Sequence, residues 1–196
     1  MTNLATALQK FAENTNLLEL EGNIKTSVPG VRFFRTSRSS PRQPLVYQSG
    51  IIIVAQGHKI IHFPERQIQY GAGDYLVLGM PMPLECEAFS DHGLPIMGLS
   101  IDVNPALLHK LVSQMQLHHQ YTQSDVCQDK SCIQSARLGA ALEQTLQRLT
   151  SALADPIEAE IFGQDIIKEL IYRVLSGPQG HILFGLAQHD GHYARV

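Results

Sequence analysis

The chain has 196 residues, of which 44% are hydrophobic and 17% are charged. These proportions are typical of globular proteins, so disorder and a fibrous architecture are excluded. Apolar runs such as 51–55 are far shorter than the roughly 20 residues of a membrane helix, and residues 1–14 lack the apolar stretch of a secretion signal. The net charge of −3 gives no general positive field for a nucleic-acid backbone. We therefore expect a soluble protein in which these residues bind neither membrane nor DNA directly.

Cys86, Cys127 and Cys132 are an odd number of cysteines without the spacing of metal ligands. Free thiols are ordinary in a reducing compartment, so the cysteines favour a cytoplasmic location. A redox pair between Cys127 and Cys132 is the less frequent alternative.

The chain begins with apolar residues at helical spacing in 1–16, which predicts a short amphipathic helix. From residue 17 to about 103 the sequence pattern changes to short apolar or alternating runs separated by Gly, Pro and Asp. This pattern is typical of strands. We place these strands at 17–20, 23–27, 31–36, 45–55, 58–63, 66–70, 74–78, 84–90 and 95–102. So many short strands leave open edges unless they close or pack in pairs, so the pattern predicts an antiparallel barrel or jelly roll.

Helical spacing returns in 104–196, beginning with the cap and first-turn proline at Asn104-Pro105. The polar segment 116–131 is predicted to be a loop. A leucine stripe follows, and Asp155-Pro156 opens a long helix that ends at 176–178, where Gly and Pro stop it. A last short helix is placed at 181–188. The fold class expected is α+β, with the β unit followed by a helical subdomain.

Several segments together resemble the N-terminal domain of AraC-type bacterial transcription regulators. They are the strand and glycine turn in 47–59, the Gly-Asp strand and Pro-rich corner in 71–83, and the segments 29–35, 95–102 and 169–180. The resemblance covers nearly the whole chain. It implies a cupin-like barrel that senses a small-molecule effector, C-terminal helices that dimerise, and no enzymatic activity. It also implies a helix-turn-helix DNA-binding part after Val196, outside these residues. The alternative is a stand-alone cupin, either an isomerase-like enzyme or a small-molecule-binding protein.

The same resemblance implies an effector pocket near Gln56, Cys86, Met97 and Leu99. These residues offer an amide, a thiol and apolar side chains, so we expect an uncharged or partly apolar effector. Arg35, from a basic segment that begins in the predicted strand 31–36, is a secondary candidate for contact with an effector. A solvated basic rim is its alternative interpretation.

A metal centre is not predicted. His58, His62 and Glu65 lie in the region that corresponds to the ligands of metal-dependent cupins, but the later histidine is missing, so the set is incomplete. The pair His189 and His192 supplies two ligands, too few for a zinc site. No cofactor is expected.

The predicted homodimer uses the leucine stripe on the helix after residue 137. An apolar stripe that one domain does not cover marks an interface, and a two-fold dimer is the default symmetry. In the alternative interpretation, the long helices pack on each other and on the β unit. The stripe consists of Leu138, Leu142, Leu146 and Leu149.

Overall fold

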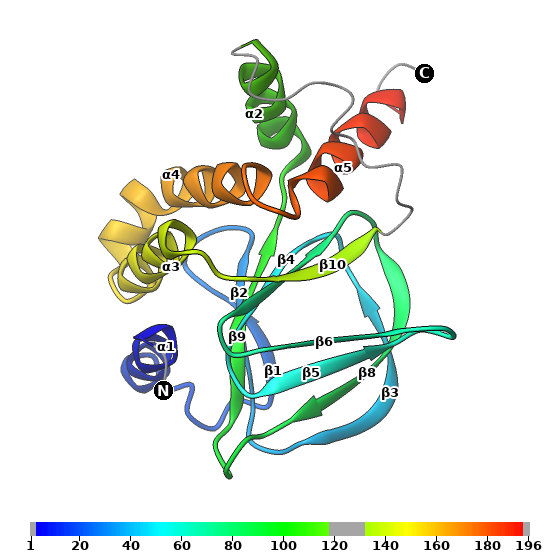
Figure 1. The fold of residues 1–196 in the computed structure, drawn as a ribbon. Coiled ribbons are helices and arrows are strands. Elements are labelled where there is room, and N and C mark those ends of the chain that lie inside the picture. The colour runs from blue at the N-terminus through cyan, green and yellow to red at the C-terminus, as the bar shows by residue number, and fades with distance from the viewer. Residues whose placement is uncertain (1–2, 118–131, 194–196) are drawn as a thin grey trace.

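The computed structural model describes the backbone of residues 3–117 and 132–193, and side chains as far as residue 187. Its strands form two antiparallel sheets that lie face to face (Figure 1). The six-stranded sheet has the order β1 (Gly22–Lys25), β2 (Val31–Thr36), β9 (Ile96–Asp102), β4 (Gly50–Gln56), β7 (Asp74–Leu78) and β10 (Ile133–Arg137). The four-stranded sheet has the order β3 (Ser40–Tyr47), β8 (Met82–Phe89), β5 (His58–His62) and β6 (Gln67–Gly71).

Strand β4 lies inside the six-stranded sheet and is buried along its whole length. Alternate side chains of a strand point to opposite faces of the sheet. Ile51 and Ile53 accordingly belong to the core under the helices, whereas Ile52 and Val54 belong to the core between the two sheets. A strand covered on both faces is apolar throughout, which explains the continuous apolar run in its sequence.

The α+β class is confirmed, and the strands form two separate sheets as in a jelly roll. The expected strand 45–55 is two strands, β3 and β4, because the chain bends at Gln48-Ser49 and β4 begins at Gly50. That residue has φ +149°, and a Cβ there would lie 2.4 Å from the carbonyl oxygen of Ile101. Residues 17–20 form a turn closed by a Leu20 N to Leu17 O hydrogen bond of 3.1 Å, where the sequence predicted a strand.

The segment expected to form a helical subdomain, 104–196, contributes strand β10 to the six-stranded sheet. This strand pairs antiparallel with β7, from Ile133 opposite Leu78 to Arg137 opposite Asp74. Its sequence, IQSAR, carries little apolar signal because only Ile133 is buried. The predicted loop 116–131 lies outside the described residues apart from its first two, which end α2.

The helices are α1 (Asn3–Asn14), α2 (Pro105–Leu117), α3 (Ala140–Leu153), α4 (Pro156–Leu175) and α5 (Gly180–Tyr193). The predicted start of α4 is confirmed, because the Asp155 carboxylate accepts hydrogen bonds from the backbone N–H of Ile157 and Glu158 at 2.8 and 3.3 Å. Helices α1, α3 and α4 lie beside the six-stranded sheet, and α2 and α5 pack together at one end of it (Figure 1). No helix within the described residues is long and apolar enough to cross a membrane.

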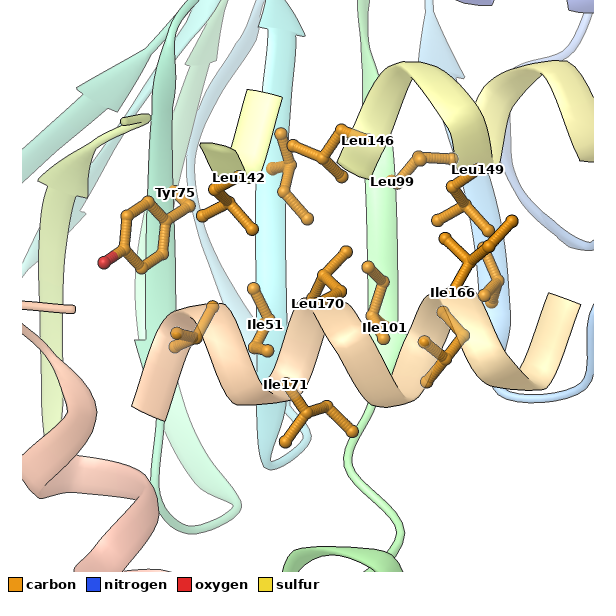
Figure 2. Close-up of a cluster of buried hydrophobic side chains, with 14 of the residues drawn as sticks. Ile51, Tyr75, Leu99, Ile101, Leu142, Leu146, Leu149, Ile166, Leu170 and Ile171 are labelled. Atoms are coloured by element: carbon orange, nitrogen blue, oxygen red, sulfur yellow. The ribbon is translucent and has the colours of Figure 1, made fainter. Parts of the chain in front are cut away.

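The main core lies where α3 and α4 meet the sheet. Figure 2 shows Leu146 of α3 and Leu170 of α4 among side chains of the strands, including Leu99 of β9. All three are fully buried. This core also includes apolar residues of α1, so helices from both ends of the chain share one apolar interior with the sheet.

Candidate functional site

The space between the two sheets is only partly filled. Two adjoining cavities of about 220 and 250 Å³ lie there and share Asn23, Phe34, Leu45 and Lys59 as lining residues. They lie behind β1 and β3, the end strands of their sheets. Leu45 is 40% exposed, which marks where the cavity opens to solvent. We call the two volumes together the sandwich cavity.

Lys59 places a cation in this cavity. It lies on β5 two residues before Ile61, which is fully buried between the sheets, so strand alternation turns both side chains the same way. Its ammonium nitrogen lies 4.4 Å from the centroid of the Phe34 ring, a cation–π distance. The Lys59 side chain is half-buried, because the cavity opens beside it. This burial still lowers the pKa of its ammonium group.

A buried polar cluster lies beside Lys59. The Tyr47 hydroxyl oxygen is 3.2 Å from that of Tyr70, and it donates a hydrogen bond to the Cys86 sulfur at 3.2 Å. Burial raises the pKa of both phenols and of the Cys86 thiol. The three groups therefore stay protonated and neutral at physiological pH, and a protonated thiol is a weak nucleophile.

Phe34 takes its position because Gly98 leaves room for it. A Cβ on Gly98 would lie 2.6 Å from the ring of Phe34 and 2.0 Å from the backbone oxygen of Ile53. The absent side chain lets β9 approach β4 closely and lets the aromatic ring lie over β9. Gly98 thus supports the ring that faces the Lys59 ammonium.

Of the five effector-binding residues proposed from the sequence, the structure brings one to the sandwich cavity. Cys86 lines it. Gln56 is buried at the end of β4, where its side-chain amide donates a 2.7 Å hydrogen bond to the Pro95 carbonyl. Met97 and Leu99 are fully buried in the core under the helices. Arg35 donates to the Leu20 carbonyl at 3.3 Å.

The placement of Met97 and Leu99 is a correction with a simple cause. On β9 the cavity is lined by Ile96 and Ser100, which lie one residue away from the positions proposed. Moving along a strand by one residue reverses the face of the sheet. Arg35 differs from its neighbour Phe34 in the same way, since Phe34 lines the cavity.

Sequence reasoning missed Lys59, Phe34 and Leu45. A signal for Lys59 was present: the strand 58–63 alternates, and a lysine two residues before a buried isoleucine shares its face. Phe34 and Leu45 carry no comparable signal, because the stacking of the two sheets decides whether their side chains point into the cavity.

His58 and His62 each meet one carboxylate. His58 Nδ1 lies 3.0 Å from Asp91 Oδ1, and its ring stacks on Phe89 with centroids 4.8 Å apart. His62 Nε2 lies 2.9 Å from Glu87 Oε2. In the described part of the chain, no group of three or more His, Cys, Asp or Glu residues is arranged to hold a metal ion. The side chains of His189 and His192 lie outside the described residues.

The leucines proposed for the dimer interface face the interior. Leu146 and Leu149 are fully buried, Leu142 is 6% exposed, and Leu138 packs partly buried against the same core. Their side chains fill the space between α3, α4 and the sheet, which is the alternative stated for this stripe. Leu142, Leu146 and Leu149 therefore present almost no surface to a partner.

Exposed apolar side chains lie instead on α4. Ile157, Ile161 and Phe162 are 69%, 60% and 51% exposed. Phe162 also lines a surface groove of about 660 Å³ between α3 and α4, in which Arg148 and Glu158 supply opposite charges. We call these three residues and the groove the α4 face.

Comparisons with solved structures give low similarities. An apo variant of ToxT from Vibrio cholerae is 12% identical, with a TM-score of 0.46 over 80% of this chain and 58% of that one. Wild-type ToxT with bound unsaturated fatty acid is 11% identical, with a TM-score of 0.47 over 80% of this chain and 56% of that one. YhaK from Escherichia coli is 19% identical, with a TM-score of 0.33 over 56% of this chain and 41% of that one.

This chain thus corresponds to little more than half the length of the ToxT chains. Among curated proteins, no match is found. The family comparison is more specific, because the model described as "AraC-type transcriptional regulator N-terminus" matches residues 27–182. The matched segment includes both sheets apart from β1, together with α2, α3 and α4. The chain therefore belongs to the family of AraC-type transcriptional regulator N-terminal domains.

Proposed function

We propose that this chain is a non-catalytic sensory domain of a cytoplasmic transcription regulator, and that its effector is a small molecule held in the sandwich cavity. The cavity is the observation that carries this proposal. It combines apolar walls with a few polar groups and one cation, as small-molecule sites do. An isomerase-like cupin enzyme, the alternative, is not favoured by the family match.

Effector binding would act by shifting an equilibrium between arrangements of this domain and a DNA-binding domain. The effector must bind one arrangement more tightly than the other, since equal affinity for both would not shift the equilibrium between them. DNA contact is assigned to that second domain because this chain has a net charge of −3.

The test is a thermal-shift screen of small metabolites on the purified domain and on a variant with a filled cavity, Ala88→Phe. Ala88 lines the sandwich cavity, whereas Ala106 is exposed on α2, so Ala106→Phe is the matched control. We expect a compound that raises the Tm of the wild type and of the control but not of Ala88→Phe. Equal stabilisation of all three proteins, or no stabilising compound, would contradict the proposal.

We also propose that the domain forms a homodimer through the α4 face. Three large apolar side chains at the surface of one helix, next to a groove, are a typical interface feature. In a two-fold interface each residue meets the partner's copy of the same patch. The patch carries both Glu158 and Arg148, which also pairs with Glu169 at 2.6 Å, so it has no excess of one charge that would repel a second copy of itself.

Sedimentation velocity at tens of micromolar tests the dimer. We expect the wild type to sediment as a dimer and Ile161→Glu to sediment as a folded monomer, because the new carboxylate would be buried without a counter-ion. Ile24→Glu introduces the same charge at an exposed isoleucine on β1 and should leave the dimer intact. A monomeric wild type, or a dimer that survives Ile161→Glu, would rule out this interface.

A further inference from the structure

The cavity contains a positive charge for which the described side chains supply no counter-ion. Among the described residues, Lys59 has neither a hydrogen bond nor an ion pair from its ammonium group. The nearby guanidinium of Arg32 differs in this respect, since it pairs with Asp102 at 2.9 Å. The Phe34 ring partly stabilises the positive charge of the ammonium, but the ring itself has no net negative charge.

The lining residues of both volumes include no Asp or Glu. Their polar members are neutral apart from Lys59 and the paired Arg32, and they include Asn23, Gln43 and Ser100. Their apolar members include Phe34 and Leu45. A partly buried charge in such surroundings is stabilised by pairing, so an occupant with a negative charge would bind favourably beside Lys59.

The charge and the volume together restrict the occupant. One unpaired ammonium matches one negative charge, whereas a phosphate dianion needs further cationic donors, and Arg32 is already held by Asp102. Each volume, at about 220 and 250 Å³, is below the roughly 300–1,000 Å³ usual for ligand pockets. A ligand larger than a short acid would therefore have to extend through both.

We propose that the sandwich cavity binds a small organic monocarboxylate, with its carboxylate on the Lys59 ammonium and its apolar part against Phe34 and Leu45. This inference rests on the proposed function, since it names the class of the effector. Of the uncharged or partly apolar effector expected from the sequence, it keeps the apolar part and adds one negative charge. The polar groups Asn23 and Ser100 would then hydrogen-bond to the second carboxylate oxygen or to substituents of the acid.

The test uses pairs of ligands that differ only in charge. Isothermal titration calorimetry of the purified domain compares hexanoate with hexanamide and benzoate with benzamide. We expect at least one acid to bind at least tenfold more tightly than its amide. Lys59→Met should abolish this difference, Lys59→Arg should keep part of it, and Lys10→Met, at an exposed lysine of α1, should not alter it.

Several outcomes would overturn the inference. They are equal binding of an acid and its amide, acid binding that persists unchanged in Lys59→Met, absence of binding by every acid, and tighter binding of inorganic phosphate than of the acids. Circular dichroism of each variant checks that it is folded. If a neutral compound from the thermal-shift screen binds and Ala88→Phe removes its binding, the proposed function stands and the carboxylate assignment fails.

Discussion

The two faces of the six-stranded sheet are built differently. The face under the helices is packed with aliphatic side chains from α1, α3 and α4. The opposite face meets the second sheet through a smaller cluster that includes two tyrosines and a cysteine, and it leaves the cavity around Lys59. Close packing supplies stability, whereas empty volume and an unpaired charge cost stability. The comparison indicates that the helix side stabilises the fold and that the space between the sheets is available for a ligand.

The largest expected effect is on the helix side. Leu146→Ala removes a fully buried side chain between α3, α4 and the sheet, and it should lower the free energy of unfolding by about 3 kcal/mol. Leu45→Ala, at a 40% exposed position of the cavity wall, should lower it by less than about 1 kcal/mol. Urea unfolding followed by circular dichroism measures both. Equal losses would mean that the two faces are equally well packed.

A second substitution tests how the cavity wall is built. Gly98→Ala places a methyl group 2.6 Å from Phe34 and 2.0 Å from the backbone oxygen of Ile53, so the strands or the ring must move. We expect a loss of about 2 kcal/mol in urea unfolding, typical of overpacking. The variant should also lose carboxylate binding, because Phe34 is displaced. Unchanged stability would show that β4 and β9 accommodate a methyl group.

The helices were the most predictable part of the molecule. The Asp155-Pro156 start and the Gly-Pro stop depend on local backbone chemistry, so α4 was found from the sequence. The sequence did not predict which side chains of β9 point into the sandwich cavity. Met97 and Ile96 are both apolar, and only the stacking of the two sheets decides which of them faces the cavity. Strand β10 was missed because an edge strand with one buried residue carries almost no alternation.

Lys59→Met should raise stability, which is the reverse of an ordinary core substitution. Burial lowers the pKa of the Lys59 ammonium below its usual 10.5, so protonation disfavours the folded state at neutral pH. We expect a gain of roughly 1 kcal/mol in the absence of ligand. The gain should shrink as the pH rises from the lowered pKa toward 10.5, where the unfolded lysine also loses its proton. Urea unfolding at neutral and alkaline pH measures this, and a loss of stability at neutral pH would contradict it.

The smallest effect concerns the ion pairs that join α3 to α4. Burial alone would raise the pKa of Glu169, but Arg148 at 2.6 Å, Thr145 at 3.0 Å and Arg173 at 3.3 Å outweigh it and lower the pKa below 4.5. Glu169→Gln should therefore cost about 1 kcal/mol or less at neutral pH, since the glutamate is partly exposed. The difference should disappear as the pH falls through the lowered pKa, because the stabilisation exists only above it. A difference independent of pH would assign the effect to packing.

Strand β10 has a consequence for how this protein can be divided. It comes from the chain after α2, yet it hydrogen-bonds to β7, while Gln179, immediately before α5, donates to the Ser135 carbonyl at 3.2 Å. A cut after residue 103 would remove the end strand of one sheet and expose the backbone of β7 as a new edge, open to pairing with other chains. We therefore expect the sheets and the helices to unfold together, and neither part to be stable when expressed on its own.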